Sequence, residues 1–344
     1  MEKLKILGIG QGTLIPSYRY RLKETKQAFK NIDLDLELFE SNTDSYPPVN
    51  KLSRFLWLIK VVLSRSPILF QQNQYDILIL QREMISTLYS FERFFTKPFI
   101  LDVDDAIHIH QKFYSIEKIS HKASAIVVCN EYLANYYQQF NKQVYMIPTP
   151  VNIDKYKPST KKDSIQIIIG WIGTSSNFQS LKSIEKELSI FLYQNPNSIL
   201  KVVSNKNPNF TLIEKDRYIY KQWSETEDVE DIQSFDIGIM PLLYTEHSRG
   251  KCAFKMLQYM SCGIPVVSSC LPMNKKILEM GKCGFCIKEK DHWVDTLAKL
   301  SQSKKIRNSF GQEGRRIIEQ QFSTKFYAKQ YKDIILKILS EGNN

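Results

Sequence analysis

The segment RGKCAFKMLQYMSCGIPVV, residues 249–267, carries the strongest indication of the fold. It predicts a glycine-containing loop, a helix over residues 253–262, and a buried strand over residues 264–269. Upstream, IQIIIGWIG (165–173) predicts a second buried strand, which ends in glycine. Buried strands that alternate with helices are typical of a parallel sheet covered on both faces. We therefore expect a Rossmann-like sheet in this half of the chain.

The same segment predicts an anion site at the start of its helix. A helix dipole and its free amides favour negative charge. Lys251 and Lys255 add two ammonium groups about one turn apart, and Gln258 can hydrogen-bond the vicinal hydroxyls of a ribose. The amides of Gly173 and Thr174, at the end of the other glycine-terminated strand, can also approach a phosphate.

The first half of the chain repeats the alternation of strands and helices. A helix is expected over residues 84–95, and a proline-rich, charged linker over residues 144–163. The predicted strands are 5–9, 34–40, 75–81, 97–105 and 123–130. The fold class is thus α/β, with two Rossmann-like domains. Their predicted bounds are residues 1–155, completed by a C-terminal helix over 325–344, and residues 160–324.

The amino-acid composition indicates a globular protein and the charge of its partner. The chain has 344 residues, 43% of them hydrophobic, and a net charge of +11. This balance excludes disordered and disulfide-scaffold proteins and favours a negatively charged partner. No nucleic-acid-binding module is recognisable, so nucleic acid is not expected as that partner. Six cysteines and no membrane-spanning run predict a cytoplasmic protein with reduced thiols. The pair Cys283 and Cys286 leaves a redox or zinc site as an alternative.

A second anion site is conceivable near the amino terminus. Gly12 follows the first strand, and Arg19 and Arg21 stand at an expected helix start, where guanidinium and amide groups can hold phosphate. The alternative is a solvated basic helix face. A NAD(P) site is not favoured, because Thr13 stands where the dinucleotide fingerprint needs a third glycine.

The segment ILDVDDAIH (100–108) places acids at a strand end. Asp102 and Asp104 have the D-x-D spacing with which some sugar transferases hold a divalent cation. Alternatively, Asp104 and Asp105 orient loops and an acceptor hydroxyl, and His108 follows closely as a candidate for proton transfer. Two sheets in one chain favour this second interpretation, with no metal site.

The stretch KLSRFLWLIKVVLSR (51–65) predicts a basic amphipathic helix. Such a helix lies on an anionic membrane in some proteins and packs into a domain core in most. The sequence is compatible with both interpretations.

These segments resemble the family-four retaining glycosyltransferases of the GT-B fold over nearly the whole chain. The resemblance rests on IIGWIGTSSNFQSL, FDIGIMPL, RGKCAFKMLQYMSCGIPVV and GRRIIEQQFS, and YDILILQRE with ILDVDDAIH is similar to a bacterial surface-polysaccharide branch. It implies two domains facing a cleft, a nucleotide-diphosphate sugar as donor and no obligatory cofactor. It also implies that Trp223 lies beside the base and adds Arg82 to the acceptor side.

The chain departs from that family at one position. The family usually has a glutamate near the donor sugar where this chain has Gly250, and Glu246, four residues earlier, is the candidate to replace it. The resulting expectation is a retaining, metal-independent transfer to a glycan or lipid-linked acceptor in surface-polysaccharide synthesis. The enzyme is then cytoplasmic, or peripheral at the inner face of the membrane through helix 51–65. A non-catalytic nucleotide-sugar or glycan-binding scaffold is the alternative, and a metal-dependent transferase built on Asp102 is a third hypothesis.

Overall fold

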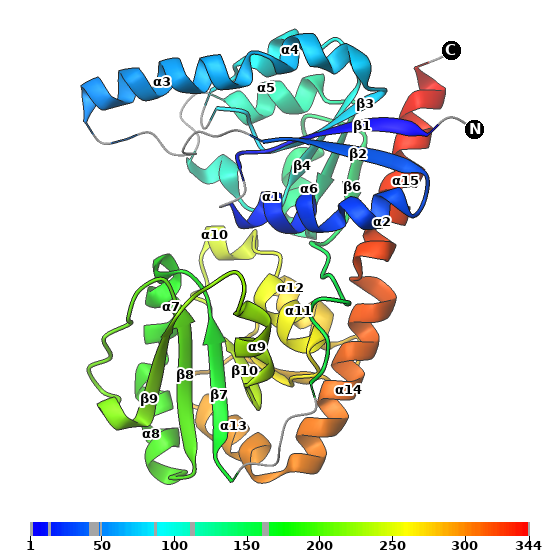
Figure 1. Cartoon of the computed structure of the whole chain (residues 1–344). Coiled ribbons are helices and arrows are strands. Elements are labelled where there is room, and N and C mark those ends of the chain that lie inside the picture. Colours follow the sequence, from blue (N-terminus) through cyan, green and yellow to red (C-terminus); the bar gives the residue numbers. More distant parts are fainter. Residues whose placement is uncertain are drawn as a thin grey trace. The chain divides into compact units, whose positions relative to one another are not determined.

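Two six-stranded parallel sheets, each in its own unit, form the framework (Figure 1). The computed structural model describes residues 3–12, 15–40, 48, 50–85, 88–110, 114–159 and 165–342. Unit 1 consists of Met1–Pro150, Gly250–Cys252 and Thr324–Asn344, and unit 2 of Val151–Arg249 and Ala253–Ser323. The short loop 250–252 therefore belongs to unit 1, although the chain on either side of it belongs to unit 2.

The sheet of unit 1 has the strand order β2-β1-β3-β4-β5-β6, with all its described pairings parallel. Its central strands are buried along their whole length because helices cover both faces, which explains their unbroken apolar sequences. The strands are β1 (Leu4–Ile9), β2 (Leu34–Phe39), β3 (Ile77–Gln81), β4 (Phe99–Val103), β5 (Ala125–Val128) and β6 (Val144–Met146). Gln81 is paired with Asp102, so the polar ends of β3 and β4 lie side by side.

Helices of unit 1 include one from the C-terminus of the chain. Helix α15 packs Tyr327, Tyr331 and Ile335 into a core that also contains Ile6 and Leu34. The α-helices are α1 (Pro16–Arg21), α2 (Lys26–Lys30), α3 (Lys51–Arg65), α4 (Ile68–Gln71), α5 (Ser115–Lys122), α6 (Glu131–Tyr137) and α15 (Thr324–Glu341). Short 3-10 helices are η1 (Lys23–Thr25), η2 (Gln72–Gln74), η3 (Phe91–Phe94) and η4 (Ile107–His110).

The prediction of a helix over residues 84–95 is wrong. Glu92 is buried, and its carboxylate accepts hydrogen bonds from the amides of Met84 and Ser90 at 2.5 and 2.8 Å. These bonds replace helical ones, so the segment forms a bridge between Ile85 and Leu88 and the single turn η3. Residues 86 and 87 lie outside the described residues.

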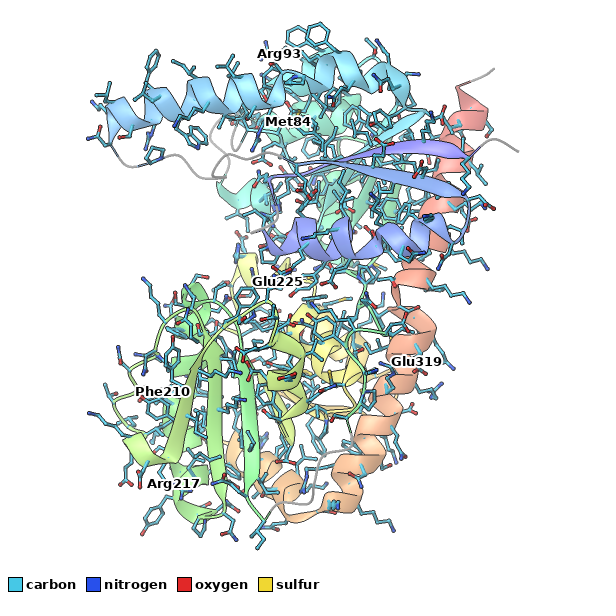
Figure 2. The ribbon with its side chains drawn as sticks, viewed as in Figure 1. Met84, Arg93, Phe210, Arg217, Glu225 and Glu319 are labelled. Atoms are coloured by element: carbon cyan, nitrogen blue, oxygen red, sulfur yellow. A yellow bond between two sulfur atoms is a disulfide. The ribbon has the colours of Figure 1, made fainter. Side chains whose placement is uncertain are left out.

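The sheet of unit 2 has the order β12-β11-β10-β7-β8-β9, again with parallel pairings. The strands are β7 (Ile167–Ile172), β8 (Ser198–Ser204), β9 (Tyr218–Gln222), β10 (Ile237–Met240), β11 (Val266–Ser269) and β12 (Gly284–Ile287). The turn before β9 is fixed by Arg217, which donates to the carbonyls of Leu192 and Ser198 at 2.6 and 2.9 Å (Figure 2).

Helices cover both faces of this second sheet as well. They are α7 (Phe178–Lys182), α8 (Glu185–Gln194), α9 (Asp228–Gln233), α10 (Glu246–Arg249), α11 (Phe254–Ser261), α12 (Pro272–Leu278), α13 (His292–Gln302) and α14 (Lys304–Gln321), with 3-10 turns η5 (Ser175–Asn177) and η6 (Lys215–Arg217). The predicted fold class is confirmed, with two Rossmann-like sheets and a C-terminal helix that completes the first unit. Part of the predicted linker, residues 160–164, lies outside the described residues.

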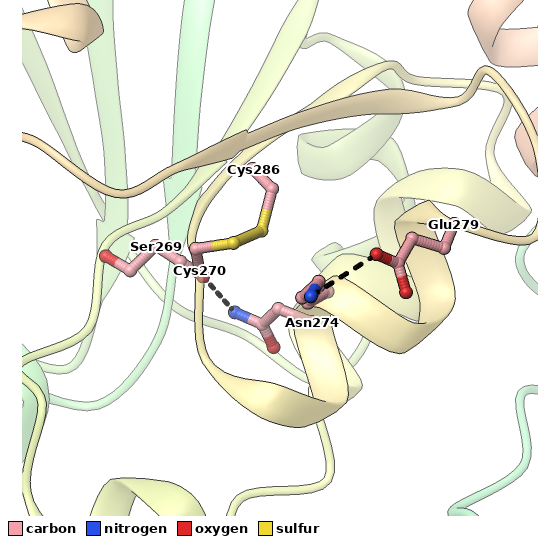
Figure 3. Close-up of a disulfide and its surroundings, with 6 residues drawn as sticks. Ser269, Cys270, Asn274, Glu279 and Cys286 are labelled. Atoms are coloured by element: carbon pink, nitrogen blue, oxygen red, sulfur yellow. Dashed lines mark hydrogen bonds and ion pairs between the residues drawn. A yellow bond between two sulfur atoms is a disulfide. The ribbon is translucent and has the colours of Figure 1, made fainter.

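A disulfide joins Cys270 to Cys286, so the expectation of fully reduced thiols is wrong (Figure 3). Cys270 follows β11 and Cys286 lies in β12, and the strand pairing brings their Cα atoms to 4.8 Å. Cys283 is buried and free, which excludes the alternative of a redox or zinc pair with Cys286. Nearby, the side-chain amide of Asn274 donates to the carbonyl of Ser269 and holds the start of α12.

Candidate functional site

In unit 2, the end of β7 and the helix α11 bring Gly173 and Lys255 together. A Cβ atom added to Gly173 would lie 2.6 Å from the Lys255 ammonium nitrogen. That nitrogen lies 4.6 Å from the centre of the Trp171 ring, over its face. A residue without a side chain at position 173 therefore leaves room for an ammonium group at the carboxyl end of the central strand. This is the edge of an open α/β sheet where ligands bind.

Helix α11 is tied to the same strand by a buried hydroxyl. The Tyr259 hydroxyl accepts a hydrogen bond from the amide of Ile172 at 3.1 Å, and burial raises its pKa far above the usual range. Helix α11 starts after Ala253, whose left-handed conformation (φ 58°) turns the chain into the helix. Gln258, three residues after Lys255 and only 4% exposed, lies on the same side of the helix. Lys255 and Gln258 are thus held by one short, anchored helix.

The other predicted donor-side groups have different local roles. The amide of Gly173 donates to the Val203 carbonyl at 3.0 Å and is part of the sheet. The Thr174 hydroxyl lies 2.8 Å from that of Ser176. Trp223 follows β9, is half-buried and packs against the core of unit 2. Gly173 therefore contributes open space rather than a free N–H group.

The position of the missing family glutamate is sterically closed. Gly250 is buried, and a Cβ atom added there would lie 2.6 Å from Ala106 Cβ and 2.9 Å from the Ala106 amide nitrogen. Because backbone atoms form this obstacle, no side chain fits without moving the loop. Glu246, the stand-in, is exposed at the first position of α10.

In unit 1, a cluster of charges gathers at the carboxyl ends of β3 and β4. Arg82 Nη2 lies 3.2 Å from Asp104 Oδ1 and 3.8 Å from Asp105 Oδ2, and Lys251 Nζ lies 3.1 Å from Asp105 Oδ2. Asn130 Nδ2 donates to the Lys251 carbonyl at 3.1 Å and fixes the loop on unit 1. The predicted pairing of Lys251 with Lys255 on one helix is therefore not seen; Lys251 precedes α11 and belongs to the other unit.

The electrostatics of this cluster keep Asp104 ionised. Burial alone would raise its pKa, but the Arg82 and Arg21 guanidinium groups hold the pKa below its ordinary value. Burial would lower the pKa of Arg82, and the charges of Asp104 and Asp105 raise it instead. Arg82 also has a left-handed backbone conformation (φ 63°), a strained state that is common at functional sites. Arg82 Nε and Gln81 Oε1 are buried without a hydrogen-bond partner among the described residues.

Arg21 and Asp102 form a buried pair that sequence reasoning did not foresee. Arg21 Nε lies 2.6 Å from Asp102 Oδ1, and neither side chain is exposed. Asp102 also accepts hydrogen bonds from the hydroxyls of Tyr327 and Tyr331 on α15. Both residues are thus used to hold the C-terminal helix, so Arg21 does not form a phosphate site and Asp102 has no oxygen left for a cation. No group of three or more His, Cys, Asp or Glu side chains suited to a metal ion occurs within the described ranges.

The remaining predicted residues of unit 1 are dispersed. Gly12 has φ 114°, a conformation that favours glycine, and its carbonyl accepts from the Ile15 amide. Arg19 is buried and stacks on Tyr20, 4.5 Å from the ring centre. His108 stacks on Tyr136 with 3.8 Å between ring centres. Only the aromatic neighbours of Arg19 and His108 in the sequence hinted at this stacking.

Comparison with known proteins agrees with this arrangement. Residues 211–317, which run from just before β9 into α14, match the model of the family described as Glycosyl transferases group 1. No curated protein matches the chain. Solved structures with similar folds include sucrose-phosphate synthase from Thermosynechococcus elongatus, with 13% identity, a TM-score of 0.73 and coverage of 98% of this chain and 100% of that one.

Two further structures are similar over nearly the whole chain. HepE from Anabaena, solved with UDP and glucose, has 12% identity and a TM-score of 0.70, covering 96% of this chain and 99% of that one. WaaG, a glycosyltransferase involved in lipopolysaccharide biosynthesis, has 12% identity and a TM-score of 0.61, covering 96% and 99%.

The family match within unit 2 and the two parallel sheets together indicate the class of enzyme to which the protein belongs. The protein is a glycosyltransferase with the GT-B fold, an enzyme of class EC 2.4. More particularly, residues 211–317 are similar to the group 1 glycosyltransferases.

Proposed function

We propose that unit 2 binds a nucleoside diphosphate sugar, with Lys255 beside the diphosphate and Gln258 on the ribose hydroxyls. The observation that carries this proposal is the Lys255 ammonium over the side-chain-free strand end at Gly173. An ammonium at the carboxyl edge of a parallel sheet and the N-terminus of α11 both favour an anion there. Trp223 and Thr174 complete the proposed donor side in unit 2, whereas Gly250, which the sequence also suggested, belongs to unit 1. Uridine is the first base to test, because HepE was solved with UDP.

In the reaction, the bond between the anomeric carbon and the diphosphate oxygen breaks, and negative charge builds up on the leaving group. A bond forms between that carbon and the oxygen of the acceptor hydroxyl, whose proton passes to the departing diphosphate. A fixed ammonium group stabilises that charge without reorganisation, which is the main electrostatic contribution in such sites. We propose that Lys255 makes this contribution and that no metal ion is required. Glu246, exposed at the start of α10, is the proposed acid near the donor sugar. Retention of anomeric configuration rests on the family resemblance.

The acceptor side is proposed to lie at the Arg82 cluster of unit 1. Arg82 Nε and Gln81 Oε1 are buried polar atoms without a partner among the described residues, and such atoms call for a ligand or water. Asp105 is more exposed than Asp104 and is our candidate to orient an acceptor hydroxyl. His108, Gly12 and Arg19 remain proposals on this side.

We further propose a glycan or lipid-linked acceptor and a role in surface-polysaccharide synthesis. The support is that WaaG acts in lipopolysaccharide biosynthesis and that TarM of S. aureus was solved with UDP and a GlcNAc-glycerol. The proposed location is the cytoplasm. None of the helices in the described ranges is long and apolar enough to cross a membrane.

The experiment compares Lys255→Ala with the matched control Lys275→Ala. Lys275 is an exposed lysine of the same unit, paired with Glu279 at 3.6 Å. Calorimetric titration with UDP-glucose and turnover with EDTA are measured for both. Loss of one charge-assisted contact predicts a drop in affinity of roughly 10- to 100-fold for Lys255→Ala and none for the control. Undiminished binding and turnover in Lys255→Ala would refute the donor assignment, and loss of turnover with EDTA would refute metal independence.

A non-catalytic nucleotide-sugar-binding protein is the second candidate, favoured by one observation. The position of the usual acid is occupied by Gly250, and Ala106 leaves no room for a side chain there. Binding of UDP-glucose with neither hydrolysis nor transfer to a broad acceptor panel would support this candidate over the enzyme.

A further inference from the structure

Helix α3 carries its apolar side chains on the outside of unit 1. Leu52, Phe55 and Leu63 are 70%, 60% and 67% exposed. Leu56, Ile59 and Val62 are exposed as well. Among the residues of α3, only Val61 and Arg65 are buried. The sequence left open whether this stripe is a core face, and these exposures exclude that interpretation.

The six exposed apolar side chains form one continuous band. At about 100° per residue, Val62, Phe55, Ile59, Leu52, Leu63 and Leu56 follow one another over an arc of roughly 120°. Val61 and Arg65 point to the opposite side, where the helix contacts its own unit. An apolar band of this width is as broad as the face that a helix normally buries. Something outside unit 1 is therefore expected to cover it.

The charges on helix α3 indicate what kind of surface covers the apolar band. Lys51 lies at one border of the band and Lys60 at the other, and Arg54 is exposed on the same helix. No acidic residue occurs from Lys51 to Tyr75. A band of large apolar side chains with cations along both borders is the pattern of helices that lie in the surface of an anionic bilayer. A protein partner with an acidic rim would be a second occupant, but the unbroken apolar band favours acyl chains.

We propose that α3 docks the enzyme onto an anionic lipid surface, with the apolar band in the acyl boundary and the lysines at the headgroups. This inference concerns a surface of unit 1 outside the Arg82 cluster and goes beyond the proposed sugar transfer. The proposed docking surface also includes Phe70, which is 80% exposed and lies on α4, the next helix after α3. Each buried apolar side chain adds to the binding, and each lysine adds attraction that salt weakens.

The test is cosedimentation of the full chain with vesicles, without donor or acceptor. Wild type is expected to bind vesicles of phosphatidylcholine with 30% phosphatidylglycerol and to lose binding at least several-fold when salt rises from 0.1 to 0.5 M. The double variant Leu56→Ser/Leu63→Ser is expected to bind at least about tenfold more weakly. Leu336→Ser is the matched control, because Leu336 is an exposed leucine of α15 in the same unit. Lys51→Glu/Lys60→Glu should also weaken binding, whereas Lys30→Glu on α2 should not.

Three results would overturn the proposal. They are absence of vesicle binding by wild type, equal binding to vesicles without phosphatidylglycerol, and binding by Leu56→Ser/Leu63→Ser that equals wild type. Light scattering after gel filtration tests self-association, and a wild-type dimer that the double variant lacks would assign the band to a second copy instead. Circular dichroism shows whether each variant is folded; all substituted side chains are exposed. Because no sugar nucleotide is present, a failure here leaves the proposed transfer intact, and a failure of the Lys255 test leaves the docking intact.

Discussion

Lys251 and Asp105, 146 positions apart in the sequence, form an ion pair with 3.1 Å between Nζ and Oδ2. The pair holds the loop 250–252 on unit 1, together with the hydrogen bond from Asn130 to the Lys251 carbonyl. The buried thiol of Cys129 donates to the carbonyl of Gly250 at 3.6 Å and adds a third contact. The loop 250–252, which follows α10 and precedes α11 in the sequence, is therefore held at the proposed acceptor side.

Restoring the family glutamate by Gly250→Glu is expected to destabilise the protein rather than to improve it. The new side chain would meet the backbone of Ala106, and overpacking of this kind costs about 1–3 kcal/mol. For a unit of this size, the melting temperature should fall by roughly 2–4 °C per kcal/mol. Thermal unfolding and UDP-glucose turnover are the measurements. Glu246→Gln, at an exposed position four residues earlier, is the control and should melt like wild type; a stable and more active Gly250→Glu variant would contradict the steric argument.

Removing the charge of Asp102 is expected to be among the most destabilising single changes in unit 1. Asp102→Asn leaves the Arg21 guanidinium buried without a counter-charge, which typically costs about 3–5 kcal/mol. It also weakens the bonds that Tyr327 and Tyr331 of α15 make to this carboxylate. The prediction is a large drop in melting temperature.

The matched control for Asp102→Asn is Glu313→Gln, which removes one partner of a partly exposed pair with Arg316. Solvent screening makes such pairs weak, so this variant should melt close to wild type. Chelator and divalent cations should leave the melting temperature of wild type unchanged if Asp102 serves the fold alone. Stabilisation by Mn²⁺ that Asp102→Asn abolishes would restore the hypothesis of a metal site.

The sequence predicts the fold because strand burial leaves a strong local pattern. The predicted strand 165–173 corresponds to β7, and the rule that parallel strands meet at one edge anticipates that Gly173 and Lys255 lie near each other. No sequence pattern indicated the position of Lys251, because Lys251 lies in the three-residue loop 250–252, which belongs to unit 1. The role of Asp102 was also hidden, because it is set by tyrosines more than 220 positions away.

Reduction of the disulfide between Cys270 and Cys286 is expected to lower the stability of unit 2. A cross-link that closes a loop of about 15 residues contributes roughly 3 kcal/mol in the chain-entropy model. The double variant Cys270→Ser/Cys286→Ser should therefore melt at a lower temperature than oxidised wild type. Dithiothreitol should lower the melting temperature of wild type and leave that of the variant unchanged.

Thiol titration of the denatured chain checks the same disulfide directly. Without reductant, four thiols are expected, those of Cys129, Cys252, Cys262 and Cys283. After reduction, all six cysteines should react. A count of six before reduction would show that the bond does not form in the isolated protein.

Acid should remove the stabilisation that Asp104 provides. Burial alone would raise the pKa of Asp104, but Arg82 and Arg21 hold it below the ordinary value of 3.8. A group whose pKa is lower in the folded state stabilises the fold above its unfolded pKa, and that contribution is lost as pH falls through the folded pKa. The difference in melting temperature between wild type and Asp104→Asn should thus be constant at neutral pH and shrink only below about pH 4. Asp154→Asn, at an exposed position, is the control and should show no such trend. A difference that already disappears between pH 7 and 5 would show that the Arg82 cluster does not hold Asp104 ionised.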